Sequence, residues 1–192
     1  MVTQTFDIAD YGLVDGMRSH PVRRRREAGR LDYRLEVVAT SVEDVVQAAG
    51  GWLFDRVMAG WKVSALIADG TGVAAAPDVR ALRVLGVRAP DPEPTDGRQA
   101  SVVQALAVSA AAFGADGGVR ERVLWALDGR CTEVALWGDG WPLRVDHRIS
   151  STRRVMSGAA RMFKGHALEA AGIRCASVDP VEKLLTGPAR MG

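Results

Sequence analysis

Four stretches of the chain place apolar residues at intervals of three and four positions, or in one unbroken run, as helices that pack on a core do. At the start of the first stretch, Thr40 and Glu43 form a capping box, in which each side chain satisfies a free backbone N–H group. The predicted helices cover residues 42–60, 101–113, 119–127 and about 150–171.

Shorter apolar or alternating runs between turn residues predict strands. Three of the predicted helices end close to a glycine, at Gly60, Gly129 and Gly172, and a short apolar run follows each one. Glycine just past a helix can adopt the left-handed conformation that turns the chain back tightly. The repeated order of helix, glycine and strand predicts β-α-β crossovers and therefore a parallel sheet. The predicted strands cover residues 33–39, 63–68, 79–87, 132–137 and 173–178.

These elements predict an α/β fold, in which a single domain has a mainly parallel sheet of about five strands with helices packed on it. We expect the domain to span residues 32–192, with a proline-rich connection at 90–98. Residues 1–31 show no sustained period, and we interpret them as a basic N-terminal arm. The length of 192 residues is typical of one domain.

The composition, 47% hydrophobic and 25% charged, is that of a globular protein rather than a disordered chain. No apolar stretch approaches the roughly 20 residues that a membrane span needs, and acidic residues stand where a signal peptide carries positive charge. We therefore expect a cytoplasmic protein without a membrane partner, whose two cysteines stay reduced.

Aspartates follow three of the predicted strands, at Asp69, Asp139 and Asp179. In a parallel sheet these positions meet at the carboxyl edge, together with the helix start at Thr40 and Ser41, and open α/β sheets bind ligands at that edge. All five residues are therefore candidates for a ligand or partner site. The alternative interpretation is structural, because Asp-Gly and Asp-Pro form turns and Thr or Ser caps a helix.

A second candidate surface is the loop around Trp141, which we expect to be partly exposed. Large aromatic side chains with a polar tip suit contact surfaces. Basic residues follow closely in the sequence, namely Arg144, His147 and Arg148. We expect this loop to contact an anionic or planar ligand, or a partner protein.

Positive charge is concentrated in two segments. Residues 18–30 and 144–164 each carry a net charge of +5, although the whole chain carries only +2. A polyanion could bind the first segment through four consecutive arginines, Arg23, Arg24, Arg25 and Arg26. The alternative is a solvated surface whose charges are compensated locally.

The sequence lacks the signatures of several common catalytic sites. No glycine-rich phosphate loop opens a helix after a strand, and no two histidines have metal-ligand spacing, so we expect no cofactor and no metal. Cys131 and His147, with Asp146 to orient the histidine, would suit a thiol nucleophile. A cysteine at the start of a strand is more typical of a small buried residue.

The first hypothesis is therefore a non-catalytic binding or regulatory protein that acts through contact with a protein partner or with a second copy of itself. The alternative is a small enzyme that uses the acidic residues at the carboxyl edge, with or without a divalent cation. A further alternative is a nucleic-acid-associated protein that binds through the basic arm.

Overall fold

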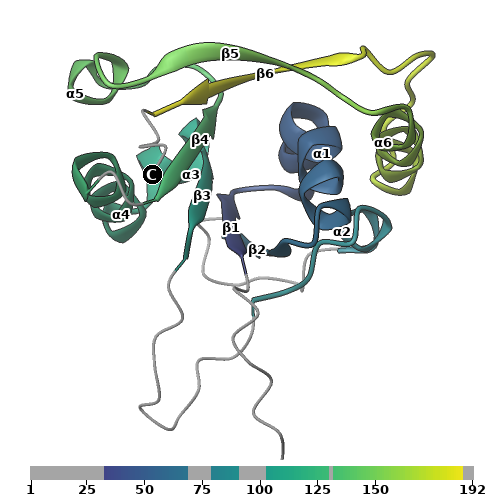
Figure 1. The fold of residues 1–192 in the computed structure, drawn as a ribbon, viewed down its shortest axis with the longest axis horizontal. Helices are drawn as coiled ribbons and strands as arrows, with labels where there is room; N and C mark the ends of the chain where they lie inside the picture. Colours follow the sequence, from purple (N-terminus) through teal and green to yellow (C-terminus); the bar gives the residue numbers. More distant parts are fainter. Residues whose placement is uncertain (1–32, 69–78, 91–102, 130–131, 188–192) are drawn as a thin grey trace, which may run out of the picture. The chain divides into compact units, whose positions relative to one another are not determined.

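A computed structural model describes residues 33–68, 79–90, 103–129 and 132–187, and the structural statements below concern these residues. They form an α/β fold with a six-stranded sheet in the order β2-β1-β3-β4-β6-β5 (Figure 1). The strands are β1 (Arg34–Ala39), β2 (Lys62–Ile67), β3 (Ala105–Ser109), β4 (Glu133–Trp137), β5 (Ser150–Val155) and β6 (Val181–Thr186). The helices are α1 (Val42–Met58), α2 (Arg80–Val84), α3 (Ala110–Ala115), α4 (Gly117–Gly129), α5 (Leu143–Asp146) and α6 (Gly158–Ala170).

The sheet is mainly parallel, which confirms the predicted fold class. β1 pairs in parallel with β2 and with β3, and β3 pairs in parallel with β4. β6 then joins β4 in antiparallel fashion, and β5 pairs antiparallel with β6 at the edge of the sheet. The strands predicted at 33–39, 63–68 and 132–137 correspond to β1, β2 and β4.

Helices cover both faces of the parallel strands. Helices α1, α2 and α6 bury their apolar side chains on one face, and α3 and α4 bury theirs on the other (Figure 1). Strand β1 contributes side chains to the cores on both faces, because alternate side chains of a strand point to opposite faces. Val37 belongs to the core under α1, and Val38 belongs to the core under α4.

Helix α1 begins and ends close to where the sequence predicts, but its cap is different. Ser41 is the N-cap, and its hydroxyl accepts a hydrogen bond from Asp44 N at 3.1 Å. The predicted capping box of Thr40 and Glu43 is therefore wrong by one position. Beyond the helix, Gly60 adopts the left-handed conformation predicted for it, with a φ of +89°, and the chain turns back into β2.

The helix predicted at 101–113 is wrong in its first half, where the structure has the strand β3. All five residues of β3 are buried, because the strand lies in the middle of the sheet with helices on both faces. Such a strand reads as one continuous apolar run, and periodicity cannot separate that run from a buried helix. The helix α3 follows directly from Ser109.

The strand predicted at 79–87 is also wrong, because residues 80–84 form α2. Arg80 and Arg83 stand three positions apart, which places them on one side of a helix but on opposite faces of a strand. Only a single bridge joins this segment to the sheet, between Arg88 and Ser64. Most of the predicted connection at 90–98 lies outside the described residues, as do residues 1–31.

The single helix predicted at 150–171 is divided in the structure into β5 and α6. The strand predicted at 173–178 is absent there, and the last strand is β6, which runs antiparallel. Strand β5 is mostly polar and lies at the sheet edge, where few side chains are buried and hydrophobic periodicity gives little signal. Figure 1 shows β5 and β6 running from β4 across α1 toward α6.

Two large side chains of the helices are exposed. His166 in α6 is 62% exposed and lies 3.7 Å from Glu169. Trp125 in α4 is 73% exposed. None of the helices in the described part of the chain is long and apolar enough to cross a membrane.

A buried ion pair joins α6 to β6 and to the middle of α1. Lys164 Nζ lies 2.6 Å from Glu182 Oε1 and also donates to the carbonyl oxygen of Gln47. The Glu182 carboxylate accepts from the backbone N–H groups of Gly51 at 2.8 Å and Trp52 at 2.7 Å. Both charges are more than nine-tenths buried, and these contacts satisfy them.

The close approach of β6 to α1 depends on Gly51. A Cβ at Gly51 would lie 1.8 Å from Met156 Sδ and 3.3 Å from Glu182 Oε1. We predict that Gly51→Ala lowers the free energy of unfolding by about 1–3 kcal/mol, because the added methyl group overpacks this contact.

The neighbouring Gly50→Ala variant is the matched control. A Cβ at Gly50 would meet its nearest atom at 3.4 Å, which is ordinary contact. We expect this variant to be neutral or stabilising by up to about 1 kcal/mol, since alanine favours helix more than glycine does. Urea unfolding measures the free energy of unfolding of both variants. An equal change in Gly51→Ala and Gly50→Ala would contradict the close approach of Met156 and Glu182 to Gly51.

Candidate functional site

The connections of the sheet diverge at the carboxyl ends of β1 and β3. After β1 the chain enters α1 on one face and continues to β2, on one side of β1. After β3, on the other side of β1, it enters α3 on the opposite face. Open α/β sheets bind ligands in the crevice at such a switch point. The ends of β1 and β3 are therefore the first place to look for a site.

A serine caps the helix that starts at each of these strand ends. Ser41 Oγ accepts from Asp44 N at 3.1 Å, and Ser109 Oγ accepts from Ala112 N at 3.1 Å. Each hydroxyl keeps its own proton as a donor. The first-turn N–H groups of α1 also lack intrahelical partners, so this edge is rich in donors.

Asp44 spans the edge from the first turn of α1 to the end of β4. Its Oδ2 accepts from Trp137 Nε1 at 2.9 Å, although the two residues are 93 positions apart in sequence. Trp137 is buried, whereas Asp44 is half-buried. The indole therefore fixes the orientation of a carboxylate that still reaches solvent.

The loop after β4 folds back on α3. Trp141 packs against Phe113 with a ring-centroid distance of 5.0 Å, and its Nε1 donates to Gly138 O at 3.0 Å. Gly138 and Gly140 have φ values of +87° and +84°, which favour glycine. Trp141 is partly buried by these contacts. Its predicted contact with a ligand or partner stays a prediction.

The residues predicted to form a site at the carboxyl edge do not all lie there. Thr40 and Ser41 lie at the switch point, and Asp139 is exposed in the loop after β4. Asp179 follows no strand, because residues 173–178 form none, and its Oδ1 accepts from Val181 N as a turn former. Asp69 lies outside the described residues, as do the four arginines Arg23, Arg24, Arg25 and Arg26 and Cys131.

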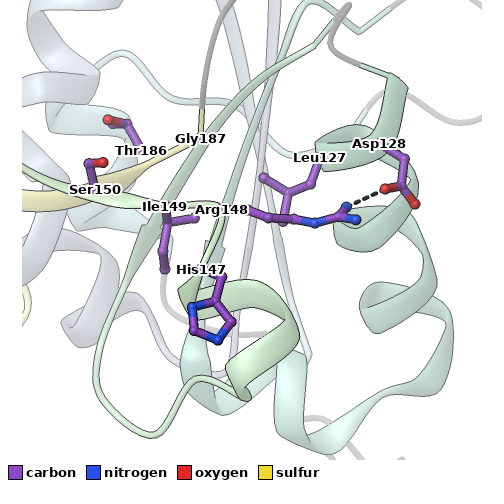
Figure 2. Close-up of a pocket in the computed structure, with 8 residues that line it drawn as sticks. All are labelled: Leu127, Asp128, His147, Arg148, Ile149, Ser150, Thr186 and Gly187. Carbon is purple, nitrogen blue, oxygen red and sulfur yellow. Dashed lines mark hydrogen bonds and ion pairs between the residues drawn. The ribbon is translucent and has the colours of Figure 1, made fainter.

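His147 and Arg148 line an open pocket away from the ends of β1 and β3, while Arg144 is exposed in α5. The pocket has a volume of about 530 Å³, and Arg148 forms an ion pair with Asp128 at its wall (Figure 2). Its lining comes from the end of α4, from the segment between α5 and the first residue of β5, and from the end of β6: Leu127, Asp128, His147, Arg148, Ile149, Ser150, Thr186 and Gly187.

The side chains at the switch point do not fit a metal centre of three or more protein ligands. The described parts of the chain contain no group of three His, Cys, Asp or Glu side chains placed to hold an ion. Protein zinc sites use at least three such ligands. Within the described residues, Asp44 is the carboxylate fixed at this edge, and its Oδ2 accepts from the Trp137 indole. We derive no step through a metal.

The chain matches no family model and no curated protein. Among solved structures, a complex of a deacetylase with teicoplanin, from the teicoplanin biosynthesis pathway, matches with a TM-score of 0.51 and 14% identity. The match covers 80% of this chain and 97% of that chain. The A40926 pseudoaglycone deacetylase matches with a TM-score of 0.47 and 15% identity, over 81% of this chain and 96% of its own. At 14% identity, the deacetylase–teicoplanin complex shows a shared fold.

The comparison overturns the first hypothesis drawn from the sequence. The prediction of a non-catalytic binding or regulatory protein is wrong, because the fold is shared with a solved enzyme. That prediction relied on missing motifs, and missing motifs exclude only the chemistries that need them. The small enzyme with acidic residues at the carboxyl edge is the better supported alternative.

Sequence reasoning missed three residues of this site. Neither Asp44 nor Trp137 is among the residues that the sequence singles out, and Ser109 falls inside the helix predicted at 101–113. One signal was available for Asp44, which stands four residues beyond a predicted strand at the expected binding edge. Its pairing with Trp137 needs the order of the strands, which the sequence does not state.

We predict that Trp137→Phe lowers the free energy of unfolding by about 1–3 kcal/mol, because Asp44 loses its indole donor while it stays half-buried. The control is Trp125→Phe, which changes an exposed ring and should shift the free energy of unfolding by no more than about 0.5 kcal/mol. Guanidinium unfolding measures both variants. A Trp137→Phe variant as stable as the control would show that the hydrogen bond does not hold the site.

Proposed function

We propose that this chain is a small enzyme whose active site lies at the carboxyl ends of β1 and β3, with Asp44 as its acid–base residue. The observation that carries the proposal is the half-buried Asp44 carboxylate, oriented by Trp137 at the switch point of the sheet. We take hydrolytic removal of an acyl group from an amine as the reaction, because the solved structure that shares the fold is a deacetylase.

Asp44 would act on the water that attacks the amide carbonyl. Its Oδ2 is held by the indole of Trp137, so Oδ1 is the oxygen left to accept a proton from water. Attack of that water forms a C–O bond and gives a tetrahedral oxyanion. The proton held by Asp44 then passes to the amine nitrogen as the C–N bond breaks, which releases the acid and the free amine.

The start of α1 would stabilise the oxyanion. The first-turn N–H groups and the helix dipole favour negative charge at this position. The Ser41 hydroxyl also has a proton to donate, because its oxygen already accepts from Asp44 N. The same helix end would thus supply the base and the donors that the oxyanion needs.

The test is acetate release from N-acetylated amines, with teicoplanin and its relatives among the substrates. We expect Asp44→Asn to lower kcat by about 10²–10⁴-fold, because the amide keeps the contact with Trp137 but cannot take a proton. Glu43→Gln is the matched control, since it removes an exposed carboxylate from the same helical turn and should keep the activity.

Two results would contradict this assignment. If Asp44→Asn keeps full activity, Asp44 is not the base, and if Glu43→Gln loses as much activity, the charge of the turn matters rather than Asp44 itself. Release of no acetate from any substrate would exclude deacetylation as the reaction. Circular dichroism of each variant verifies that the fold is retained.

A further inference from the structure

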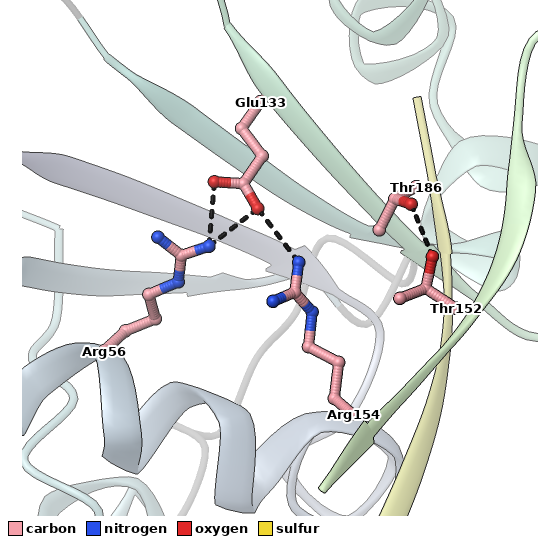
Figure 3. Close-up of polar contacts among 5 residues, drawn as sticks. All are labelled: Arg56, Glu133, Thr152, Arg154 and Thr186. Carbon is pink, nitrogen blue, oxygen red and sulfur yellow. Dashed lines mark hydrogen bonds and ion pairs between the residues drawn. The ribbon is translucent and has the colours of Figure 1, made fainter. Parts of the chain in front are cut away.

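Two arginines share one carboxylate at the other end of α1. Arg56 in the last turn of α1 donates from Nη2 to both oxygens of Glu133, at 2.6 and 2.8 Å. Arg154 of β5 donates from Nη2 to Glu133 Oε1 at 3.3 Å (Figure 3). Because Glu133 is the first residue of β4, this cluster lies at the amino edge of the parallel strands, opposite the proposed active site.

The cluster carries a positive charge that Glu133 does not balance. Two guanidinium groups and one carboxylate leave a net charge of +1. The side chains of Arg56 and Glu133 are only 18% and 21% exposed, so solvent screens this charge incompletely. A partly buried charge without a counter-ion is unfavourable, so an anion would be stabilised here.

Two buried donors of the cluster have no hydrogen-bond partner. Within the described residues, the buried side-chain nitrogens without a partner are Trp52 Nε1 and Arg154 Nε. The Arg154 guanidinium carbon lies 5.9 Å from the centre of the Trp52 ring, so the two side chains that carry these donors are neighbours. Trp52 itself is 4% exposed. Buried donors are rarely left unpaired, so this arrangement points to an acceptor that the described residues do not supply.

The two arginines differ in how firmly they are held. The guanidinium carbon of Arg56 lies 5.4 Å from the ring centre of Trp52 and 4.5 Å from that of Trp61, and Arg56 makes both short contacts to Glu133. Arg154 makes one long contact to Glu133, belongs to the edge strand β5 and is 35% exposed. Arg154 is therefore the arginine whose guanidinium group can shift to meet a ligand.

We propose that this cluster binds the carboxylate group of a small ligand between Arg154 and the Trp52 indole. A carboxylate carries the single negative charge that balances the cluster. It also accepts two parallel N–H bonds from the Nε and Nη edge of an arginine, which would use the unpaired Arg154 Nε. Its oxygens would also reach the Trp52 donor. The site does not depend on the reaction proposed for the opposite edge.

The experiment follows the two unpaired N–H groups directly by 1H–15N NMR of the full chain. Sodium acetate is the probe, added to about 0.1 M with chloride removed in step, so that ionic screening stays constant. We expect saturable shifts of the Trp52 indole and Arg154 Nε–H signals, which the Trp52→Phe and Arg154→Gln variants assign. Inorganic phosphate, titrated in the same way, should bind more weakly than acetate.

Arg154→Gln should weaken acetate binding by about tenfold or more, because it removes the charged fork, and the Trp52 indole signal reports this loss. The matched control is Arg153→Gln, which removes the same charge from the exposed face of β5 and should leave the affinity unchanged. Arg154→Lys keeps the charge but loses the bidentate geometry, so it should also bind more weakly.

Several outcomes would overturn the proposal. Signals that do not move with acetate would show that the unpaired donors take no carboxylate. Equal weakening by Arg153→Gln would reduce the effect to net charge, and tighter binding of phosphate would reject a carboxylate as the ligand class. An Arg154→Gln variant that fails to fold by circular dichroism leaves Arg154→Lys as the deciding variant, and unchanged acetate affinity in it would also overturn the proposal.

Discussion

The buried ion pair between Lys164 and Glu182 holds the helix on which both proposed sites depend. Helix α1 carries Asp44 in its first turn and Arg56 in its last turn, and the ion pair meets it in between. Removing one partner of a buried pair leaves the other charge unbalanced, which typically costs about 3–5 kcal/mol. The position of α1 against α6 and β6 therefore depends on a contact between charged residues, not on apolar packing alone.

The contact also explains the glycine pair inside α1. Glycine in a helix costs about 1 kcal/mol relative to alanine, so two in succession need a compensating contact. At Gly51 the compensation is the approach of Glu182 and Met156, which a side chain would block. The Lys164 ammonium meets the carbonyl oxygen of Gln47 one turn earlier. Strand β6 is thereby fixed to the helix as well as to β4 and β5.

Local signals predicted the part of the fold that local interactions determine. The segment of β1, α1 and β2 follows from apolar periodicity and a glycine turn within about 35 residues, although the helix cap is Ser41 rather than the predicted Thr40. β3 was missed because its burial on both faces comes from its place in the sheet, and β5 because an edge strand need not be apolar.

The candidate site was predictable to the same extent. Ser41 was found because it follows β1 directly and the carboxyl edge binds ligands. Asp44 gains its role from Trp137, and Arg154 from Glu133 and Trp52, through contacts between strands and helices that are distant in sequence. The sequence gives no periodic signal for such side chains, because their contacts depend on the order of the strands in the sheet.

The shared fold says less about the reaction than the side chains at the sheet edges do, since one fold can host many reactions. At 14% identity, a catalytic role has to be argued from this chain's own side chains. Within the described residues, the carboxyl edge offers one oriented carboxylate, Asp44, beside helix N–H donors, which suits proton transfer to and from a neutral amide. The amino edge offers surplus guanidinium donors, which suit an anion. The two proposed sites at the ends of α1 would therefore take groups of different charge, and the free backbone donors of α1 lie at the end where the proposed reaction develops negative charge.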